Sequence, residues 1–122
     1  IINKDVVIVI MLETPEAIEQ VEEIAKVQGI DVLLIGTNDL CMEMGIPGEY
    51  DHYRVKKSYE KVIDACLKNS VCPGMGGVYS TKLMEFYISM GMRFILSGSD
   101  LSFMMSSAQE RANHLTNFFK QN

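Results

Sequence analysis

The chain has 122 residues, enough for a single domain spanning residues 1–122. Hydrophobic residues make up 48% and charged residues 22%, a balance that is typical of a globular fold and excludes a disordered tail, a coiled coil or a collagen-like chain. The formal net charge of -5 argues against a nucleic-acid partner, because contacts to phosphates need excess positive charge.

The cysteines and the apolar runs indicate the cellular location of the protein. The chain has three cysteines: Cys41, Cys66 and Cys72. They cannot all pair and lack the CxxC spacing of a zinc or redox site, so we expect a reducing, cytoplasmic location. Residues 6–12 (VVIVIML), the longest apolar run, are too few to cross a bilayer, and we expect no leader and no membrane partner. Because Ile1 stands directly before a strong strand, we also expect that an upstream part has been removed.

The first part of the chain predicts two strands, each followed by a helical segment. Residues 6–12 form a β-branched run of the kind buried on both faces of a parallel sheet, so we expect a central strand. Thr14 can cap the helix that starts with Pro15, and apolar residues at helical spacing continue to Gly29. Residues 31–35 (DVLLI) predict the second strand, followed by a short helix or turn over 38–44.

The second part continues the alternation. A loop at 45–48 (GIPG) precedes a long amphipathic helix that begins at His52 and has an apolar face: Val55, Tyr59, Val62, Ile63, Cys66 and Leu67. A third strand lies within residues 71–76, and Ser80 can cap the next helix, which ends at Gly91. Residues 93–97 (RFILS) predict the fourth strand. The last helix presents an apolar face: Leu101, Met104, Met105, Ala108, Ala112, Leu115 and Phe119.

This alternation predicts the α/β class, with a parallel sheet covered by helices and right-handed crossovers. Four strand-helix units are half of the eight in a TIM (βα)8 barrel, which typically needs about 250 residues. The arithmetic therefore predicts a parallel (βα)4 half barrel. A self-sufficient four-stranded doubly wound domain fits the same pattern, and periodicity alone does not choose between the two.

Two acidic residues stand where chemistry is expected, at the carboxyl ends of consecutive predicted strands. Glu13 follows the first strand and Asp39 follows the second. Because neighbouring parallel strands lie about 4.8 Å apart, both carboxylates can reach one ion. Two anionic oxygen ligands suit Mg²⁺ or Mn²⁺ and leave other positions for water and substrate. Each acid can instead cap a helix or lie in solvent, and both interpretations stay open at this point.

Glycine-containing turns follow three of the predicted strands. Residues 36–38 (GTN) lead into a helical segment, whose free backbone N–H groups can bind a carboxylate or phosphate. Residues 74–77 (GMGG) can allow a ligand close to the backbone or simply form a tight turn. Residues 98–100 (GSD) have the same shape as the turn at 36–38, but Asp100 there can simply be a helix cap. His52 and His114 have no nucleophile in a recognisable pattern, so we expect them at the surface.

Six short motifs occur in a fixed order: MLET at 11–14, IGTNDL at 35–40, GIPG at 45–48, GMGGVY at 74–79, MGMRF at 90–94 and GSDL at 98–101. Through them nearly the whole chain resembles the carboxyl-terminal half of an HpcH/HpaI-type aldolase, a family of the phosphoenolpyruvate/pyruvate-binding TIM barrels. The resemblance implies that Glu13 and Asp39 are the protein ligands of a divalent metal, Mg²⁺, Mn²⁺ or Co²⁺. It implies backbone binding of the pyruvate carboxylate at Gly36, Thr37 and Asn38, and a pocket wall at Gly76, Gly77 and Val78.

The implied reaction is the metal-dependent, class II cleavage of a 4-hydroxy-2-oxo acid to pyruvate and an aldehyde. In the family the metal acts as a Lewis acid on the keto acid and stabilises the enolate that forms when the C3–C4 bond breaks. No lysine Schiff base is required, in agreement with the lack of a lysine at the carboxyl end of any predicted strand. A half barrel leaves two open sheet edges, so we expect a homo-oligomer.

The sequence departs from the family in lacking the first four strand-helix units, which supply an arginine that holds the substrate and a histidine-centred group that handles the proton. Neither group maps onto this chain, and His52 and Arg54 are not assigned to these roles. We therefore expect the chain alone to bind metal weakly and to turn over little or no substrate. The alternatives are a lyase of acyl-CoA substrates, a phosphoenolpyruvate-using enzyme, which usually shows a Cys-Gly-Glu element where this chain has residues 74–78, and a non-catalytic barrel fragment.

Overall fold

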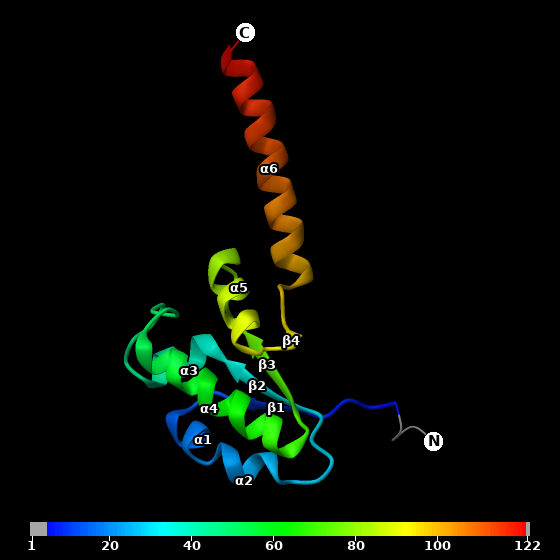
Figure 1. The fold of residues 1–122 in the computed structure, drawn as a ribbon. Coiled ribbons are helices and arrows are strands. Elements are labelled where there is room, and N and C mark those ends of the chain that lie inside the picture. Colours follow the sequence, from blue (N-terminus) through cyan, green and yellow to red (C-terminus); the bar gives the residue numbers. More distant parts are fainter. Residues whose placement is uncertain (1–4, 122) are drawn as a thin grey trace.

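A computed structural model describes residues 5–121, which form a four-stranded parallel sheet with helices packed against it (Figure 1). In chain order the elements are β1 (Val9–Leu12), α1 (Pro15–Glu19), α2 (Val21–Ala25), β2 (Val32–Gly36), α3 (Thr37–Glu43), α4 (Tyr53–Asn69), β3 (Cys72–Gly76), α5 (Thr81–Met90), β4 (Phe94–Ile95) and α6 (Asp100–Gln121). The predicted alternation of strands and helices is confirmed, with boundaries that differ by a few residues.

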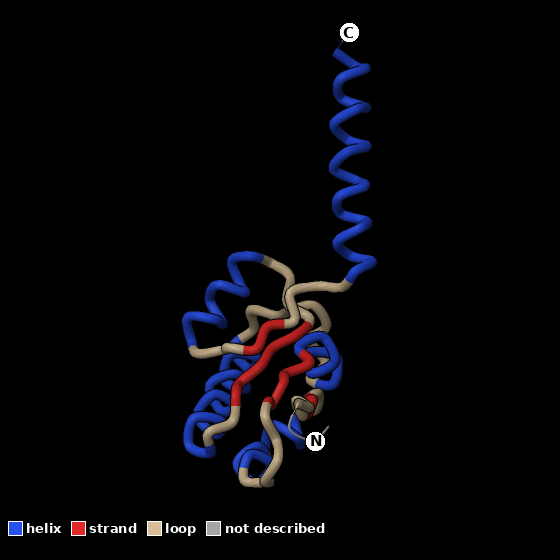
Figure 2. Tube along the Cα trace, turned by 90° about the vertical axis from the view of Figure 1, so that its right-hand side faces the viewer, coloured by secondary structure: helices blue, strands red, loops and turns tan. Residues whose placement is uncertain are grey.

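The strands follow one another across the sheet in the order of the sequence, β1-β2-β3-β4, and every neighbouring pair is parallel (Figure 2). In a doubly wound sheet the strand order reverses at one point, whereas the strands of a barrel follow each other without reversal. The observed order therefore favours part of a barrel over a self-sufficient doubly wound domain.

The hydrophobic core lies between the sheet and α1–α5. Leu33 and Ile35 of β2 belong to this core, together with buried side chains from all five helices. Because side chains alternate along a strand, Val32 and Leu34 lie on the opposite face. A Cβ atom at Gly74 would lie 2.9 Å from Val32 Cγ1 and 3.0 Å from Leu34 Cδ1, so these side chains fill the space over a glycine of the neighbouring strand.

The prediction of a central first strand is wrong, because β1 lies at the edge of the sheet and pairs only with β2. It begins at Val9, and the apolar residues 6–8 before it are exposed. Met11, within β1, has 50% of its surface exposed. Among the described residues, no strand pairs with the outer edge of β1. An apolar run that is suited to a central strand therefore stands at an open edge of the sheet.

Three further elements differ from the prediction. β4 is limited to Phe94–Ile95, where residues 93–97 were expected, and as the other edge strand it pairs only with β3. The helix after Thr14 is divided at Gln20, whose ψ of 6° is not helical, into α1 and α2. Ser80 stands at the N-cap position of α5, but its side chain makes no capping hydrogen bond.

The last helix forms as predicted, but its apolar face is not packed on the sheet. α6 extends away from the other elements (Figures 1 and 2), and all side chains from residue 100 to 120 are exposed. Phe119 is 77% exposed and Met104 is 64% exposed. Despite the length of α6, no helix in the described part of the chain combines the length and hydrophobicity needed to span a membrane.

The core predicts a large difference between two leucines. Leu33 is fully buried on β2, whereas Leu67 on α4 is 71% exposed. In this protein, Leu33→Ala should lower the free energy of unfolding by about 2–5 kcal/mol, because it leaves a cavity in the core. Leu67→Ala should change it by no more than about 0.5 kcal/mol. Urea unfolding of both variants measures this, and equal losses would contradict the placement of the core.

Candidate metal and substrate site

The pairing of β1 with β2 brings Glu13 beside Gly36. Leu12 pairs with Ile35, so the two residues that follow them meet at the carboxyl edge of the sheet. A Cβ atom at Gly36 would lie 2.8 Å from Glu13 Cγ and 2.9 Å from Glu13 Oε1. The half-buried side chain of Glu13 thus occupies the space that a side chain at position 36 would need.

Asp39 reaches the same edge from the first turn of α3, which begins directly after β2, and it is exposed. Within the described residues, the carboxylates of Glu13 and Asp39 accept no hydrogen bond and form no ion pair. Two carboxylates without a cationic partner form a donor set that fits a divalent cation. No group of three or more His, Cys, Asp or Glu residues suited to a metal occurs in the described part of the chain, so this donor set would leave positions for other ligands.

The start of α3 lies against the end of β3. The first N–H groups of a helix have no acceptor within the helix. A Cβ atom at Gly77 would lie 3.1 Å from the backbone nitrogen of Asn38 and 3.7 Å from that of Thr37. Gly77 has a φ of +82°, a conformation that favours glycine. A glycine at this position therefore leaves room beside the backbone nitrogens that were predicted to bind a carboxylate.

The other two predicted wall residues differ in what they can offer. Gly76 is buried and pairs with Gly36 across the β2–β3 ladder, so the two glycines lie next to each other at the edge. The side chain of Val78 is 1% exposed and belongs to the hydrophobic core. Val78 as a whole therefore offers almost no accessible surface to a ligand, which does not support its predicted place in the pocket wall.

Three tyrosines, which the sequence pattern did not connect with the site, form a cluster, and two of them contact the start of α3. The hydroxyls of Tyr59 and Thr37 are 2.7 Å apart, and both residues are fully buried. The Tyr59 ring stacks on that of Tyr87, whose hydroxyl donates to the carbonyl of Tyr50. The hydroxyl of Tyr50 donates to Asn38 Oδ1 at 3.1 Å.

The chemistry of these phenols is set by burial. Desolvation raises the pKa of Tyr59 and of Tyr87, so both remain neutral hydrogen-bonding groups at physiological pH. One sequence signal pointed to this cluster: a tyrosine on the apolar face of a helix needs a partner for its hydroxyl when it is buried.

The remaining sequence candidates have structural roles. Burial raises the pKa of the Cys41 thiol and raises that of Cys66 to about 12, so neither is a thiolate nucleophile at neutral pH. His52 is the N-cap of α4, where its Nδ1 accepts a hydrogen bond from the backbone N–H of Arg54 at 3.2 Å.

A reciprocal serine pair caps α6. The N–H of Ser102 donates to Ser99 Oγ at 3.3 Å, and the N–H of Ser99 donates to Ser102 Oγ at 2.9 Å. This is the arrangement of a capping box. Among the described residues, the carboxylate of Asp100 accepts a hydrogen bond only from the N–H of the next residue, Leu101, so the main capping role belongs to Ser99.

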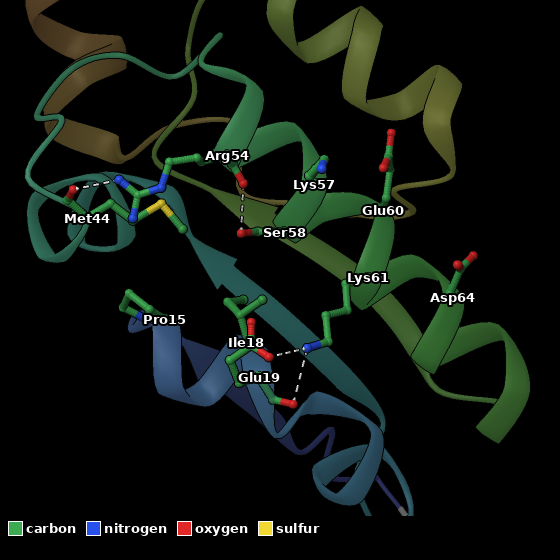
Figure 3. A pocket seen from close by; sticks show the side chains of 10 residues that line it. All are labelled: Pro15, Ile18, Glu19, Met44, Arg54, Lys57, Ser58, Glu60, Lys61 and Asp64. Atoms are coloured by element: carbon green, nitrogen blue, oxygen red, sulfur yellow. Dashed lines mark hydrogen bonds and ion pairs between the residues drawn. The ribbon is translucent and has the colours of Figure 1, made fainter.

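A surface hollow of about 530 Å³ lies between α1 and α4, away from the predicted site residues (Figure 3). Three basic and three acidic side chains line it, and they partly satisfy each other. Lys61 bonds to Glu19 Oε2 at 2.9 Å, and Arg54 donates to the carbonyl of Met44 at 3.1 Å (Figure 3). The hollow contains neither carboxylate of the candidate site, so we do not assign it the chemistry.

Comparison with known proteins gives consistent matches. The family model described as HpcH/HpaI aldolase/citrate lyase matches residues 1–107. The chain is 38% identical over 107 residues to the 4-hydroxy-4-methyl-2-oxoglutarate aldolase of Hapsidospora irregularis, covering 86% of this chain and 40% of that protein. It is 27% identical over 110 residues to the 4-hydroxy-2-oxo-heptane-1,7-dioate aldolase of Escherichia coli, covering 90% and 42%.

A solved structure has the same fold. The crystal structure of the HpcH/HpaI aldolase from Desulfitobacterium hafniense matches with a TM-score of 0.82 and 26% identity, covering 93% of this chain and 44% of that chain. The chain spans about two fifths of the length of the curated relatives it matches.

Two alanine variants distinguish the effect of the close contact between Gly77 and the start of α3 from the effect of backbone strain. Gly48 has a φ of +79° but nothing within 4 Å of a Cβ atom, whereas Gly77 has the same conformation and the contact to Asn38. Gly48→Ala should lower the free energy of unfolding by about 1–2 kcal/mol, the cost of a left-handed alanine. Gly77→Ala should lose at least about 1 kcal/mol more through overpacking. Urea unfolding of the full-length variants tests this, and similar losses would show that the contact does not matter.

Proposed function

Because the chain belongs to the HpcH/HpaI aldolase/citrate lyase family, we propose that it is the part of a class II aldolase that holds the divalent metal and pyruvate. The proposed reaction is the reversible cleavage of a 4-hydroxy-2-oxo acid to pyruvate and an aldehyde. Two curated relatives are named as aldolases of such acids, which supports the substrate class. The observation that carries the proposal is the close approach of Glu13 to Gly36 at the carboxyl end of β2, directly before the first turn of α3, which contains the exposed Asp39.

The proposal gives each residue a defined task. Glu13 and Asp39 hold Mg²⁺, Mn²⁺ or Co²⁺, which when bound supplies Lewis-acid chemistry at the keto group of the substrate. The backbone N–H groups at 36–38 hold the carboxylate of the 2-oxo acid and orient it. Gly76 and Gly77 keep side chains away from this space, because neither carries a Cβ atom.

The proposed active site needs more than this chain. Both edges of the described sheet, β1 and β4, lack a further strand among the described residues, and the chain spans about two fifths of the length of its curated relatives. We therefore propose that groups outside this chain complete the site and handle the proton and the aldehyde.

Association into a homo-oligomer is also part of the proposal. Apolar side chains of α6 are exposed along the helix, among them Phe103, Leu115 and Phe119. Exposed apolar surface of this extent is typical of protein contacts. The cytoplasmic location expected from the cysteines stays a prediction.

The metal site is tested by ligand-dependent stability. In the full-length protein, Mn²⁺ together with pyruvate or oxalate should raise Tm, because both bind the folded state. Asp39→Asn should weaken Mn²⁺ binding by at least about tenfold. Losing a residue that only hydrogen-bonds to a metal ligand already weakens metal binding by about this factor, and Asp39 is proposed to be a ligand itself. Glu43→Gln is the matched control, because Glu43 is an exposed acid on the same helix but lies in its last turn. Indifference of Tm to metal and keto acid, or equal behaviour of the two variants, would contradict the proposal and favour a non-catalytic scaffold.

The incompleteness of the site gives a separate prediction. The 122-residue chain, produced alone, should show little or no aldol turnover of pyruvate with an aldehyde acceptor, with or without Mn²⁺. The full-length protein assayed in parallel should be active, and far-UV circular dichroism should report whether the short chain has folded. Robust turnover by the short chain would contradict this prediction.

A further inference from the structure

We propose that Tyr59 is a positioning residue for the proposed 2-oxo acid site, because its buried hydroxyl fixes the first residue of α3. The inference rests on the proposed function and adds a residue that makes no contact with metal or substrate. The backbone N–H groups at the start of α3 keep the orientation needed to bind a carboxylate only while Tyr59 on α4 holds Thr37 in place.

The contact between Tyr59 and Thr37 joins two elements that are distant in sequence. Tyr59 lies on α4, 22 residues after Thr37, and both side chains have 0% of their surface exposed. Their hydroxyl oxygens are 2.7 Å apart, and either hydroxyl can be the donor. A buried hydroxyl that loses its partner costs free energy because water cannot replace the bond. The pair therefore restrains the position of Thr37 strongly.

A second restraint acts on the next residue of α3. Tyr50 donates to Asn38 Oδ1 at 3.1 Å, and its own carbonyl accepts from the hydroxyl of Tyr87. The ring of Tyr87 stacks on that of Tyr59, with centroids 3.7 Å apart and an angle of 19° between the planes. Contacts therefore run from Thr37 through three tyrosines to Asn38, and the two adjacent residues are tied to a single cluster.

On the opposite side of the turn, no side chain of the described residues is recorded as a comparable restraint. Gly77 lies beside the backbone nitrogen of Asn38. Because glycine has no side chain, Gly77 cannot hold this nitrogen in place through a side-chain contact. The tyrosine cluster thus fixes the turn from one side, while the glycine keeps the other side open. This combination suits a backbone that must keep its orientation and remain accessible to a ligand.

The kinetic consequence follows from what the turn is proposed to bind. The carboxylate of the 2-oxo acid keeps its charge during the reaction, so the turn binds it equally in the ground state and the transition state. Loss of such uniform binding raises KM and leaves kcat largely unchanged. A purely structural role of Tyr59 would lower stability and the amount of folded enzyme but would leave the KM of the folded fraction unchanged.

The test uses the full-length protein loaded with Mn²⁺. Tyr59→Phe removes the hydroxyl and keeps the stacked ring, and we expect KM for pyruvate in the aldol direction to rise about five- to tenfold, with kcat changed less than about twofold. Ser58→Ala is the matched control. Ser58 is also buried on α4, but its hydroxyl donates to the carbonyl of Arg54 in the same helix at 3.1 Å, so its removal should leave KM unchanged.

The partner residue provides the second measurement. Thr37→Val should raise KM as Tyr59→Phe does, whereas Thr37→Ser, which keeps a hydroxyl for Tyr59, should raise KM clearly less than Thr37→Val. The double variant should have no higher KM than either single variant, because both changes remove the same bond. If Tyr59→Phe does not fold, the comparison of Thr37→Val with Thr37→Ser decides.

The outcomes separate the two proposals. An active enzyme in which Tyr59→Phe leaves KM unchanged, or in which Ser58→Ala raises it equally, overturns the positioning role and leaves the proposed function standing. Equal KM values for Thr37→Val and Thr37→Ser also overturn it. A natural full-length protein that neither turns over nor binds pyruvate overturns the proposed function itself.

Discussion

The register between β1 and β2 decides where the groups at the carboxyl edge lie. Leu12 pairs with Ile35, which places Glu13 next to Gly36, a residue without a side chain. Asp39 follows three residues later, in the first turn of α3. A shift of one residue would turn every side chain of β1 to the opposite face of the sheet. Glu13 would then point into the hydrophobic core, and Leu12 would leave it. The burial of Leu12, at 1% exposure, therefore fixes the position of the carboxylate as well.

The sequence predicted the features that depend on local pattern and on general rules of topology. Four strands, the long helix α4 and the last helix all appear where the apolar periodicity placed them. The expectation that Glu13 and Asp39 share one edge follows from the rule that parallel strands end on the same side. These inferences need only the order of elements along the chain, which hydrophobic spacing and glycine positions reveal.

The features that the sequence did not predict depend on contacts between distant segments. The edge position of β1 depends on which neighbours a strand has, and an apolar run does not carry that information. The link between Tyr59 and Thr37 spans 22 residues, and that between Tyr87 and Tyr50 spans 37. Ser70 ends α4 in the left-handed conformation with a φ of 58°, at a position where glycine would have been the expected signal.

The close approach of Glu13 to Gly36 also ties the evolution of two positions together. Alanine at 36 has an acceptable backbone conformation there, since the φ of -80° suits any residue, so the nearest obstacle is the side chain of Glu13. If a smaller residue replaced Glu13 in a related protein, position 36 could accept a residue other than glycine. As long as the glutamate is kept, an alanine at 36 has to displace it, so covariation between these two sites should persist across related sequences.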